Sequence, residues 1–177
     1  MHKHSSPILD YSELKKLIDA HKTLGRRIVC TIGSWDMLHI GHLRYLIKAK
    51  EQGDVLIVGA DSNRGIKIYK NELRPIIPQE ERMEMLQYQE CVDYVTLVDD
   101  IDEHGKWQYG LIQTIRPYLF VTTPESYSEE QIRDIRQYSD EVLVLPRQAE
   151  STSSSEIIES TVKKHLEIML SEIGKKR

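Results

Sequence analysis

The chain has little cysteine, and its two cysteines are placed where they cannot build a local site. Cys30 and Cys91 lie far apart, form no C-x-x-C pair and have no histidine neighbour at the spacing of metal ligands. A disulfide framework and a cysteine-based zinc site are therefore excluded as organising features. We expect both residues to be buried, reduced thiols, which fits a reducing compartment.

Long apolar runs and a strong excess of one charge are missing as well. No stretch approaches the roughly 18 apolar residues of a membrane-spanning helix, and Met1–Pro7 is polar and unlike a secretion signal. Its His2 and His4 are expected to be incidental rather than metal ligands. The net charge of −4 provides no broad basic surface for nucleic acid. We expect a cytoplasmic protein without membrane or nucleic-acid partners.

The composition is that of an ordinary globular chain. Its 177 residues, of which 40% are hydrophobic, suffice for one domain with a buried core. No internal repeat, low-complexity linker or second domain is visible. We therefore predict a single domain over residues 1–177. Within it, 1–7 form a flexible tail, 12–160 form the core, and 161–177 form a C-terminal helical extension and tail.

Apolar runs typical of strands alternate with amphipathic helical patterns along most of the chain. This alternation predicts right-handed crossovers and a parallel sheet with helices on both faces. The predicted fold is α/β: a Rossmann-like five-stranded parallel sheet with extra N- and C-terminal helices. The strands are predicted from Ile28 onward and over Asp54–Ala60, Tyr94–Val98, Tyr118–Thr122 and Val142–Leu145. The helices are predicted over Ser12–Leu24, from His39 onward, and over Glu80–Gln89, Trp107–Ile115, Glu129–Tyr138 and Glu156 to about Ile173.

The last predicted helix is longer than covering a sheet requires. Its apolar residues form a broad stripe that continues to about Ile173. We expect its far end to pack on the N-terminal helix or on a second subunit, with Gly174–Arg177 as a solvated tail.

The segment 28–46, IVCTIGSWDMLHIGHLRYL, combines a buried strand, a glycine turn and the start of a helix. A helix N-terminus presents unpaired N–H groups and a partial positive charge, so it attracts phosphate. Gly33 allows a ligand to approach the backbone, and Gly41 keeps the space between two histidines free. His39 and His42 are three residues apart, so both rings can face one side of the first helical turn. The segment predicts two hydrogen-bond donors over one phosphoryl group, as phosphoryl and nucleotidyl transfer require.

Two histidines three positions apart also have ordinary explanations. Such pairs are usually surface or half-buried side chains, and the H-x-G-H spacing alone does not decide for a site. The preceding strand, glycine and G-x-W-D residues favour the functional interpretation, because structural context confirms a motif. His39–His42 also reads H-I-G-H, as in class I aminoacyl-tRNA synthetases, but no K-M-S-K-S loop or anticodon-binding domain accompanies it.

The residues G-S-W-D-M-L-H-I-G-H-L-R-Y-L resemble the G-x-F-D-x-x-H-x-G-H signature of the cytidylyltransferase-like nucleotidyltransferases. The flanking stretches E-L-K-K-L-I-D-A-H-K-T-L-G-R-R-I-V and A-K-E-Q-G-D-V-L-I-V are similar to the adenylyltransferase domain of bacterial ADP-heptose synthase. Glycerol-3-phosphate cytidylyltransferase is a more distant relative. The resemblance covers about residues 12 to 160 and weakens after Val121.

The resemblance implies further phosphate-binding cations. Lys67 and Lys70 match the K-x-x-K positions of the heptose-type enzymes, and Arg82 matches the last arginine of their R-P-x-x-P-x-x-x-R stretch. The ammonium groups of the two lysines would follow negative charge onto the leaving pyrophosphate. The alternatives are that Lys70 and, less readily, Lys67 are solvated loop lysines, and that Arg82 pairs on the surface with Glu80, Glu81 or Glu84.

A run of hydroxyls at 151–155 lies directly before the last helix. Ser153 with Glu156 fits a capping box, but capping explains one serine and not the whole run. The same stretch resembles the family's R-x-x-x-x-S-T-T loop. The resemblance implies that the β- and γ-phosphates are held by Arg147, Thr152, Ser153 and Ser154.

The sequence departs from the heptose-type pattern in three places. Trp35 replaces a phenylalanine and keeps an aromatic plug, while the retained Asp36 is expected to orient the acceptor or a neighbouring group. After the second strand, Asn63 stands where the family has a carboxylate near the acceptor. The family's Lys-Gly-Gly-Asp-Tyr-like loop, which touches base and substrate, reads Val121-Thr-Thr-Pro-Glu-Ser-Tyr127 here. The base and the acceptor therefore stay open.

Together, the residues and the resemblance predict a nucleotidyltransferase. A phosphorylated acceptor, a sugar phosphate first of all, would attack the α-phosphorus of ATP or CTP and release pyrophosphate. Mg²⁺ would be carried mainly by the phosphates, and the family likeness implies a homodimer. The predicted catalytic residues are His39, His42 and Lys67. The predicted nucleotide-binding residues are Ile32, Gly33, Ser34, Trp35, Gly41, Lys70, Arg82, Thr122, Arg147, Thr152, Ser153 and Ser154, and the predicted acceptor-binding residues are Asp36 and Asn63.

Two other kinds of function fit the sequence. The R-P-I-I-P-x-E-x-R stretch is also similar to archaeal-type FAD synthetases, and a glycerol-3-phosphate or phosphocholine cytidylyltransferase would use the same phosphate chemistry. The altered loop after Val121 also permits a nucleotide-binding module that has lost turnover.

Overall fold

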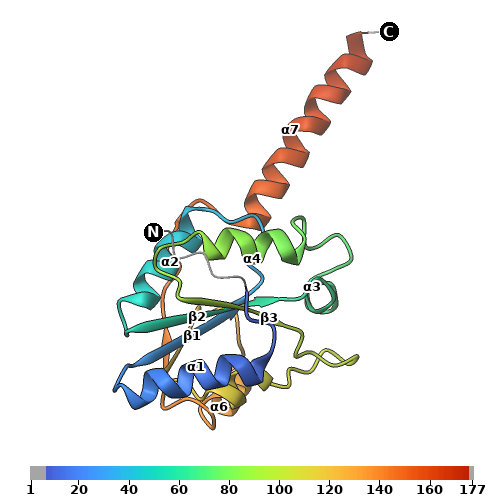
Figure 1. The fold of residues 1–177 in the computed structure, drawn as a ribbon. Helices are drawn as coiled ribbons and strands as arrows, with labels where there is room; N and C mark the ends of the chain where they lie inside the picture. The colour runs from blue at the N-terminus through green and yellow to red at the C-terminus, as the bar shows by residue number, and fades with distance from the viewer. Residues whose placement is uncertain (1–6, 176–177) are drawn as a thin grey trace.

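The sheet confirms the α/β fold that the alternating pattern predicts. The computed structural model describes residues 7–175, and the side chains through residue 171. Its five strands are all parallel, in the order β3-β2-β1-β4-β5 (Figure 1). The strands are β1 (Ile28–Gly33), β2 (Val55–Asp61), β3 (Tyr94–Val98), β4 (Leu119–Thr122) and β5 (Glu141–Val144).

Helices cover both faces of this sheet (Figure 1). One face carries α2 (Ile40–Lys50) and α4 (Gln79–Gln87), and the other carries α1 (Tyr11–Thr23), α5 (Gly110–Ile115) and α6 (Glu129–Ile135). The remaining two helices are α3 (Asn63–Tyr69), directly after β2, and the long C-terminal α7 (Ser154–Lys175).

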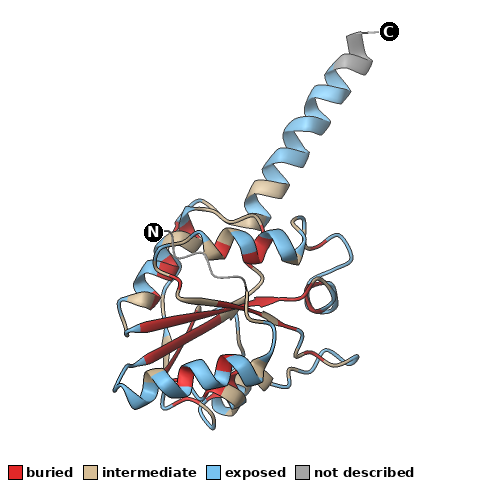
Figure 2. Ribbon diagram, viewed as in Figure 1, coloured by how far each residue is buried: buried red, intermediate tan, exposed pale blue. Residues whose placement is uncertain are grey.

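Alternate residues of the central strands feed the two hydrophobic cores, as the period of a strand dictates. In β1, Val29 packs with the α2 residue Leu46, while its neighbours Ile28 and Cys30 pack on the opposite face with Leu14 of α1. β2 is buried along its whole length, as its apolar run predicts (Figure 2). The carboxyl ends of these buried strands therefore form a rigid base for a site.

Two local differences from the sequence prediction matter for the site. The sequence analysis predicts no helix directly after β2, but the segment forms α3, whose N-cap Ser62 accepts a hydrogen bond at Oγ from the Gly65 N–H at 2.9 Å. The helix predicted over Trp107–Ile115 begins only at Gly110, because Trp107 forms an isolated antiparallel bridge with Ile101. Of the other predicted elements, β3 has the predicted bounds, and the rest are present with ends shifted by a few residues.

α7 extends away from the rest of the protein (Figure 1). Its described side chains from Glu159 onward are exposed, and Val162, Leu166 and Met169 are each more than half exposed. The expectation that this end packs on α1 is therefore wrong for the single chain, whereas its contact with a second subunit stays a prediction. Of the tail predicted over 1–7, residues 1–6 lie outside the described part. No helix within the described part is long and apolar enough to cross a membrane.

Candidate active site

A cavity of about 410 Å³ opens at the carboxyl ends of β1 and β4. Its size suits a small ligand, and ligands of parallel sheets bind at this edge. The turn after β1, the start of α2 and the loop before α7 form most of its wall. Of the predicted site residues, the wall contains Ile32, Gly33, Ser34, Trp35, His39, Gly41, His42, Lys70, Thr122, Arg147, Thr152, Ser153 and Ser154. Asp36, Asn63, Lys67 and Arg82 lie outside it.

His39 is both a cavity residue and the N-cap of α2. Its backbone is extended, and its Nδ1 accepts a hydrogen bond from the Gly41 N–H at 3.1 Å. In a neutral imidazole an accepting Nδ1 leaves the proton on Nε2. Because Nδ1 of His39 caps the helix, the ring is held in place and its N–H donor is at Nε2.

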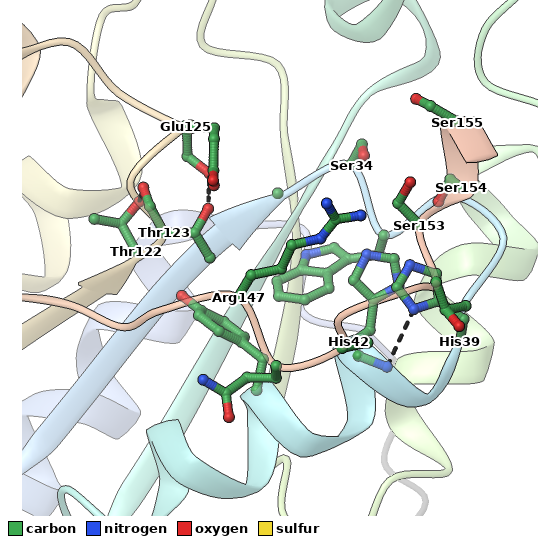
Figure 3. A pocket seen from close by; sticks show the side chains of 18 of the residues that line it. Ser34, His39, His42, Thr122, Thr123, Glu125, Arg147, Ser153, Ser154 and Ser155 are labelled. Atoms are coloured by element: carbon green, nitrogen blue, oxygen red, sulfur yellow. Dashed lines mark hydrogen bonds between the residues drawn. The ribbon is translucent and has the colours of Figure 1, made fainter.

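The His42 ring stacks on that of His39, with ring centroids 4.0 Å apart and planes 26° from parallel (Figure 3). Trp35 supports His42 edge-on at 5.5 Å between centroids. Burial, followed by the nearby His39 and Lys70, lowers the pKa of His42 to about 3. Burial also lowers the pKa of His39. The two rings are therefore neutral at pH 7, and they lie together as the helical spacing predicts.

The glycines of this segment are explained by the aromatic rings beside them. A Cβ on Gly41 would lie 2.9 Å from Cε1 of His39 and 3.1 Å from the Cβ of Ala149. A side chain there would push the imidazole off its partner, so Gly41 preserves the stack. A Cβ on Gly33 would lie 3.3 Å from the Trp35 ring, so the indole accounts for the glycine at that position.

The turn between β1 and α2 holds two residues in an unfavourable backbone conformation. Trp35 and Met37 have φ values of 50° and 53°, in the left-handed region. This conformation costs about 1–3 kcal/mol for each non-glycine residue and persists only where surrounding contacts impose it. Here the buried Trp35 indole donates from Nε1 to the Gly59 carbonyl at 2.8 Å. Nothing in the residue pattern of this segment predicts the strain.

Asp36 is fully buried between the two strained residues and acts inside the protein. Its carboxylate accepts hydrogen bonds from Nε of Arg74 at 2.8 Å and from the N–H groups of Ile76 and Ile77 at 3.0 Å each. Burial raises the pKa of Asp36, but these donors outweigh burial and hold the pKa below its usual value. Asp36 thus fixes the segment 74–77 against the turn, which agrees with the expected orienting of a neighbouring group and not with a direct contact to the acceptor.

Arg74 is a cavity residue that the sequence analysis did not assign to the site. Its Nε binds Asp36, while its Nη2 is buried without a hydrogen-bond partner among the described residues. The R-P-x-x-P stretch was the only feature of the sequence that indicated a role for Arg74. A buried guanidinium with an unused donor at the cavity wall is suited to an anionic ligand.

Arg82 is internal as well, while Asn63 is half-buried beside it, and neither residue lies in the cavity wall. The fully buried Arg82 donates to the carbonyls of Ile77 at 2.9 Å, Asp61 at 2.7 Å and also Ser34. Its Nη2 also lies 3.1 Å from the Asn63 side-chain oxygen. Arg82 thereby ties β2, α3 and the turn after β1 together. A structural role replaces both the expected phosphate contact and the alternative of a surface ion pair.

The two lysines of the K-x-x-K pattern occupy different environments. Lys70 follows α3 directly, lies in the cavity wall and donates from Nζ to Ser34 Oγ at 3.0 Å. Lys67 lies inside α3, its side chain is 48% exposed, and its Nζ is 3.9 Å from Glu72. The two side chains do not converge, because Lys70 lies just past the end of α3 and reaches Ser34, whereas Lys67 lies near Glu72. Lys70, and not Lys67, is brought to the site.

The hydroxyl run before α7 meets the histidine turn at the cavity (Figure 3). Ser154 donates from Oγ to the Asp36 carbonyl at 2.5 Å, and Ser153 Oγ accepts the Glu156 N–H at 3.2 Å. The Glu156 carboxylate accepts from Arg147 at 2.9 Å. The first turn of α7 is therefore fastened to the turn after β1, and its N-terminal hydroxyls lie beside the imidazoles.

The segment after β4 forms another part of the wall, apart from the imidazoles (Figure 3). Thr122 is buried, whereas Glu125 is exposed, and the hydroxyls of Thr123 and Ser126 are 2.8 Å apart. The segment stands out in the sequence because it departs from the family pattern, but Thr122 is its only residue that the sequence predicts to be in the site. The wall residues that it missed are Thr31, Tyr45, Arg74, Thr123, Glu125, Ser126, Gln148, Ala149 and Ser155.

The charges of the wall suit a polyanion. Its described residues include the cations Lys70, Arg74 and Arg147, with Glu125 as the one carboxylate. Neutral imidazole donors and the N-terminus of a long helix add to this preference for negative charge. Among the described residues, no group of three or more His, Cys, Asp or Glu side chains could hold a metal ion.

Sequence relatives match only part of their own length. The bifunctional protein HldE of Geobacter sulfurreducens is 42% identical over 108 residues, which are 61% of this chain and 21% of the relative. The bifunctional protein HldE of Nitratiruptor sp. is 44% identical over 115 residues, which are 64% of this chain and 24% of the relative. The chain thus spans less than a quarter of these two relatives.

Solved structures and a family model complete the comparison. The lipopolysaccharide core biosynthesis protein from Thermoplasma volcanium has a TM-score of 0.56 at 21% identity, over 72% of this chain and 100% of that one. Pantoate-beta-alanine ligase from Francisella tularensis, complexed with beta-gamma ATP and beta-alanine, has a TM-score of 0.57 at 14% identity, over 82% and 68% of the two chains. At such identities these likenesses show the fold alone. A model of the Cytidylyltransferase-like family matches residues 30–160, and the chain belongs to this family.

Proposed function

We propose that this protein transfers the nucleoside monophosphate of ATP or CTP to a phosphorylated acceptor, a sugar phosphate first of all, and releases pyrophosphate. The observation that carries the proposal is the stacked pair His39 and His42 in a wall that also holds three cations and a run of hydroxyls. Fixed donors of this kind stabilise charge on phosphoryl oxygens without reorganising during the reaction. The family supports the same class of reaction.

In the proposed reaction an oxygen of the acceptor phosphate attacks the α-phosphorus in line, and the bond from this phosphorus to pyrophosphate breaks. His39 and His42 donate N–H groups to the α-phosphoryl oxygens. Lys70 takes the role first expected of Lys67 and meets the charge on the leaving oxygens, because it lies in the cavity wall. The step needs no covalent intermediate on the protein.

The β- and γ-phosphates are assigned to the start of α7. Thr152, Ser153 and Ser154 line the cavity there, and Arg147 adds a guanidinium. The triphosphate would compete with Glu156 for this guanidinium, because the two are paired at 2.9 Å without a ligand. Mg²⁺ would be held by the phosphate oxygens and would neutralise part of their charge.

The base and the acceptor are assigned to the segment after β4. An ionised carboxylate accepts hydrogen bonds and donates none, so Glu125 suits an amino or hydroxyl group. Adenine and cytosine both carry an amino group, and sugar phosphates carry hydroxyls. This end of the cavity is therefore consistent with ATP or CTP and with a sugar acceptor.

Binding and turnover experiments test the proposal in two steps. Calorimetry with ATP and CTP in the presence of Mg²⁺ first measures binding. Pyrophosphate release is then followed with sugar 1-phosphates, glycerol 3-phosphate, phosphocholine and FMN. Release with one sugar phosphate supports the proposal. Tight binding with no release on any acceptor contradicts it and favours a nucleotide-binding module.

We also propose that α7 pairs with a second copy of the chain. Val162, Leu166 and Met169 recur at helical spacing on one side of this helix, and all are exposed in the single chain. Leu166→Glu should shift sedimentation toward the monomer. Ser160→Glu adds the same charge on the opposite side of the helix and should leave the dimer intact. A wild-type protein that sediments as a monomer at micromolar concentration contradicts this part of the proposal.

A further inference from the structure

Asp61 is a buried carboxylate at the end of β2 that none of the assigned roles uses. It is 3% exposed, and its Oδ2 accepts a hydrogen bond from the Tyr69 hydroxyl at 2.7 Å. Its Oδ1 is buried and has no hydrogen-bond partner among the described residues. An ionised carboxylate is costly in such a place unless charge compensates it.

The hydrogen bond from Tyr69 connects Asp61 to the phosphate end of the cavity. Tyr69 is the last residue of α3, and Lys70 follows it in the chain. The Lys70 ammonium lies 5.8 Å from the centroid of the Tyr69 ring and donates to Ser34 Oγ at 3.0 Å. Anchoring Tyr69 on the end of β2 therefore determines where the chain leaves α3 and where Lys70 enters the cavity wall.

We infer that Asp61 is a positioning residue that acts through Tyr69 on Lys70, and that it takes up a proton when a nucleoside triphosphate binds. The inference rests on the proposed function, since it requires a nucleotide at the cavity. Without nucleotide, the charges of Arg82 and, to a lesser extent, Lys70 favour the ionised carboxylate. When phosphate oxygens engage Lys70 and bring several negative charges, Asp61 loses the part of this compensation that Lys70 supplies. A proton from solvent then neutralises it, and it returns to solvent when the products leave.

The surroundings of Asp61 are consistent with titration near neutral pH. Burial raises its pKa to about 6, against the hydrogen bond from Tyr69 and the charges of Arg82 and Lys70, while Asp100 acts in the same direction as burial. The other titratable groups that face it are the phenols of Tyr11 and Tyr127. Burial raises the pKa of each phenol, so neither is charged at neutral pH.

The sign of the pH dependence follows from linkage. Above pH 6 the free protein holds Asp61 ionised, so binding that protonates it consumes a proton and is favoured as the pH falls. Nucleotide affinity should therefore weaken as the pH rises above 6, by at most about tenfold per pH unit for one proton. Asp61→Asn removes the proton-binding group and should flatten this dependence.

Calorimetry in buffers of different ionisation enthalpy measures the proton uptake directly. At pH 7 the wild-type chain should take up as much as about one proton more than Asp61→Asn on binding Mg²⁺-ATP or Mg²⁺-CTP. The comparison cancels protons exchanged by His39 and by the nucleotide itself. Asp99→Asn is the matched control, because it removes a half-exposed carboxylate at the end of the neighbouring β3 whose pKa lies below its usual value.

Tyr69→Phe provides a second variant that keeps the ring in place. Without the phenol donor the charged carboxylate is less stabilised, so the uptake should be smaller at pH 7 and move to higher pH. Equal proton uptake by wild type, Asp61→Asn and Tyr69→Phe would overturn the inference while nucleotide binding still stands. A wild-type chain that binds neither nucleotide would contradict the proposed function instead.

Discussion

The turn after β1 and the segment after β4 line the same cavity but are held very differently. In the turn, Trp35 and Asp36 are at most 5% exposed, and buried hydrogen bonds hold both side chains. After β4, residues 124–126 are exposed, and the bend is closed by the hydroxyl pair of Thr123 and Ser126 and by a hydrogen bond from the Ser126 N–H to the Thr123 carbonyl at 3.2 Å. If the cavity binds a nucleotide as proposed, the difference teaches that the end facing the phosphates is built in advance, while the other end is left for a substrate to order.

The largest effect is expected from a substitution that removes buried hydrogen bonds beside the turn after β1. Arg82→Met leaves the carbonyls of Ser34, Asp61 and Ile77 without their donor. Since each buried unsatisfied acceptor costs about 1–3 kcal/mol, the free energy of unfolding should fall by about 3 kcal/mol or more. Urea denaturation measures this change. Lys67→Met, which removes an exposed cation from α3, should stay within about 0.5 kcal/mol of wild type, and equal losses in both variants would contradict the structural role of Arg82.

The next largest effect concerns the imidazole stack. His42→Ala should lower kcat by about 10² to 10³, the usual loss for one oxyanion donor, and reduce nucleotide binding less. Single-turnover pyrophosphate release measures the chemical step, and calorimetry measures binding. His104→Ala is the control, since the His104 side chain is 83% exposed and outside the cavity wall. An unchanged kcat in His42→Ala would refute the role of the pair.

The turn after β1 is also the part of the site that the sequence predicts best. The apolar runs of β1 and β2, the glycines and the histidine spacing are local patterns, and they led to the sheet, the turn and the stacked rings. Both cores follow from the same patterns, because alternate strand residues face opposite sides. These patterns do not predict which way a long polar side chain points after the turn.

Arg82 and Arg74 illustrate that limit. Both stand in one R-P-x-x-P-x-x-x-R stretch, yet Arg82 turns inward to carbonyls while Arg74 reaches both Asp36 and the cavity wall. Their partners come from strands and turns distant in sequence, so tertiary contacts decide which cation is structural. The left-handed φ values of Trp35 and Met37 likewise depend on buried contacts and leave no trace in the sequence.

A smaller effect separates the two lysines. Lys70→Ala removes a charged donor from the cavity wall, and such hydrogen bonds are worth about 1.5–3 kcal/mol. Its kcat/KM for the nucleotide should therefore fall by about tenfold to a hundredfold. Lys67→Ala, three residues earlier and half exposed, should stay within about twofold of wild type. Steady-state kinetics of both variants measures the contrast, and the reverse order would restore the role that the sequence assigned to Lys67.

The smallest effect is expected on the exposed side of the comparison. Glu125→Gln keeps the size of the side chain but removes the carboxylate that accepts hydrogen bonds from base or acceptor. A loss of about 0.5–1.5 kcal/mol should raise KM for one of the two substrates by about threefold to tenfold. The kcat should stay within about twofold of wild type, because a contact made equally in the ground state and the transition state changes only binding. Glu130→Gln, exposed on α6 and outside the cavity wall, is the matched control. If Glu125→Gln instead lowered kcat as strongly as His42→Ala, the segment after β4 would take part in the chemical step. The contrast between a preorganised side of the cavity and a side that only binds substrate would then be wrong.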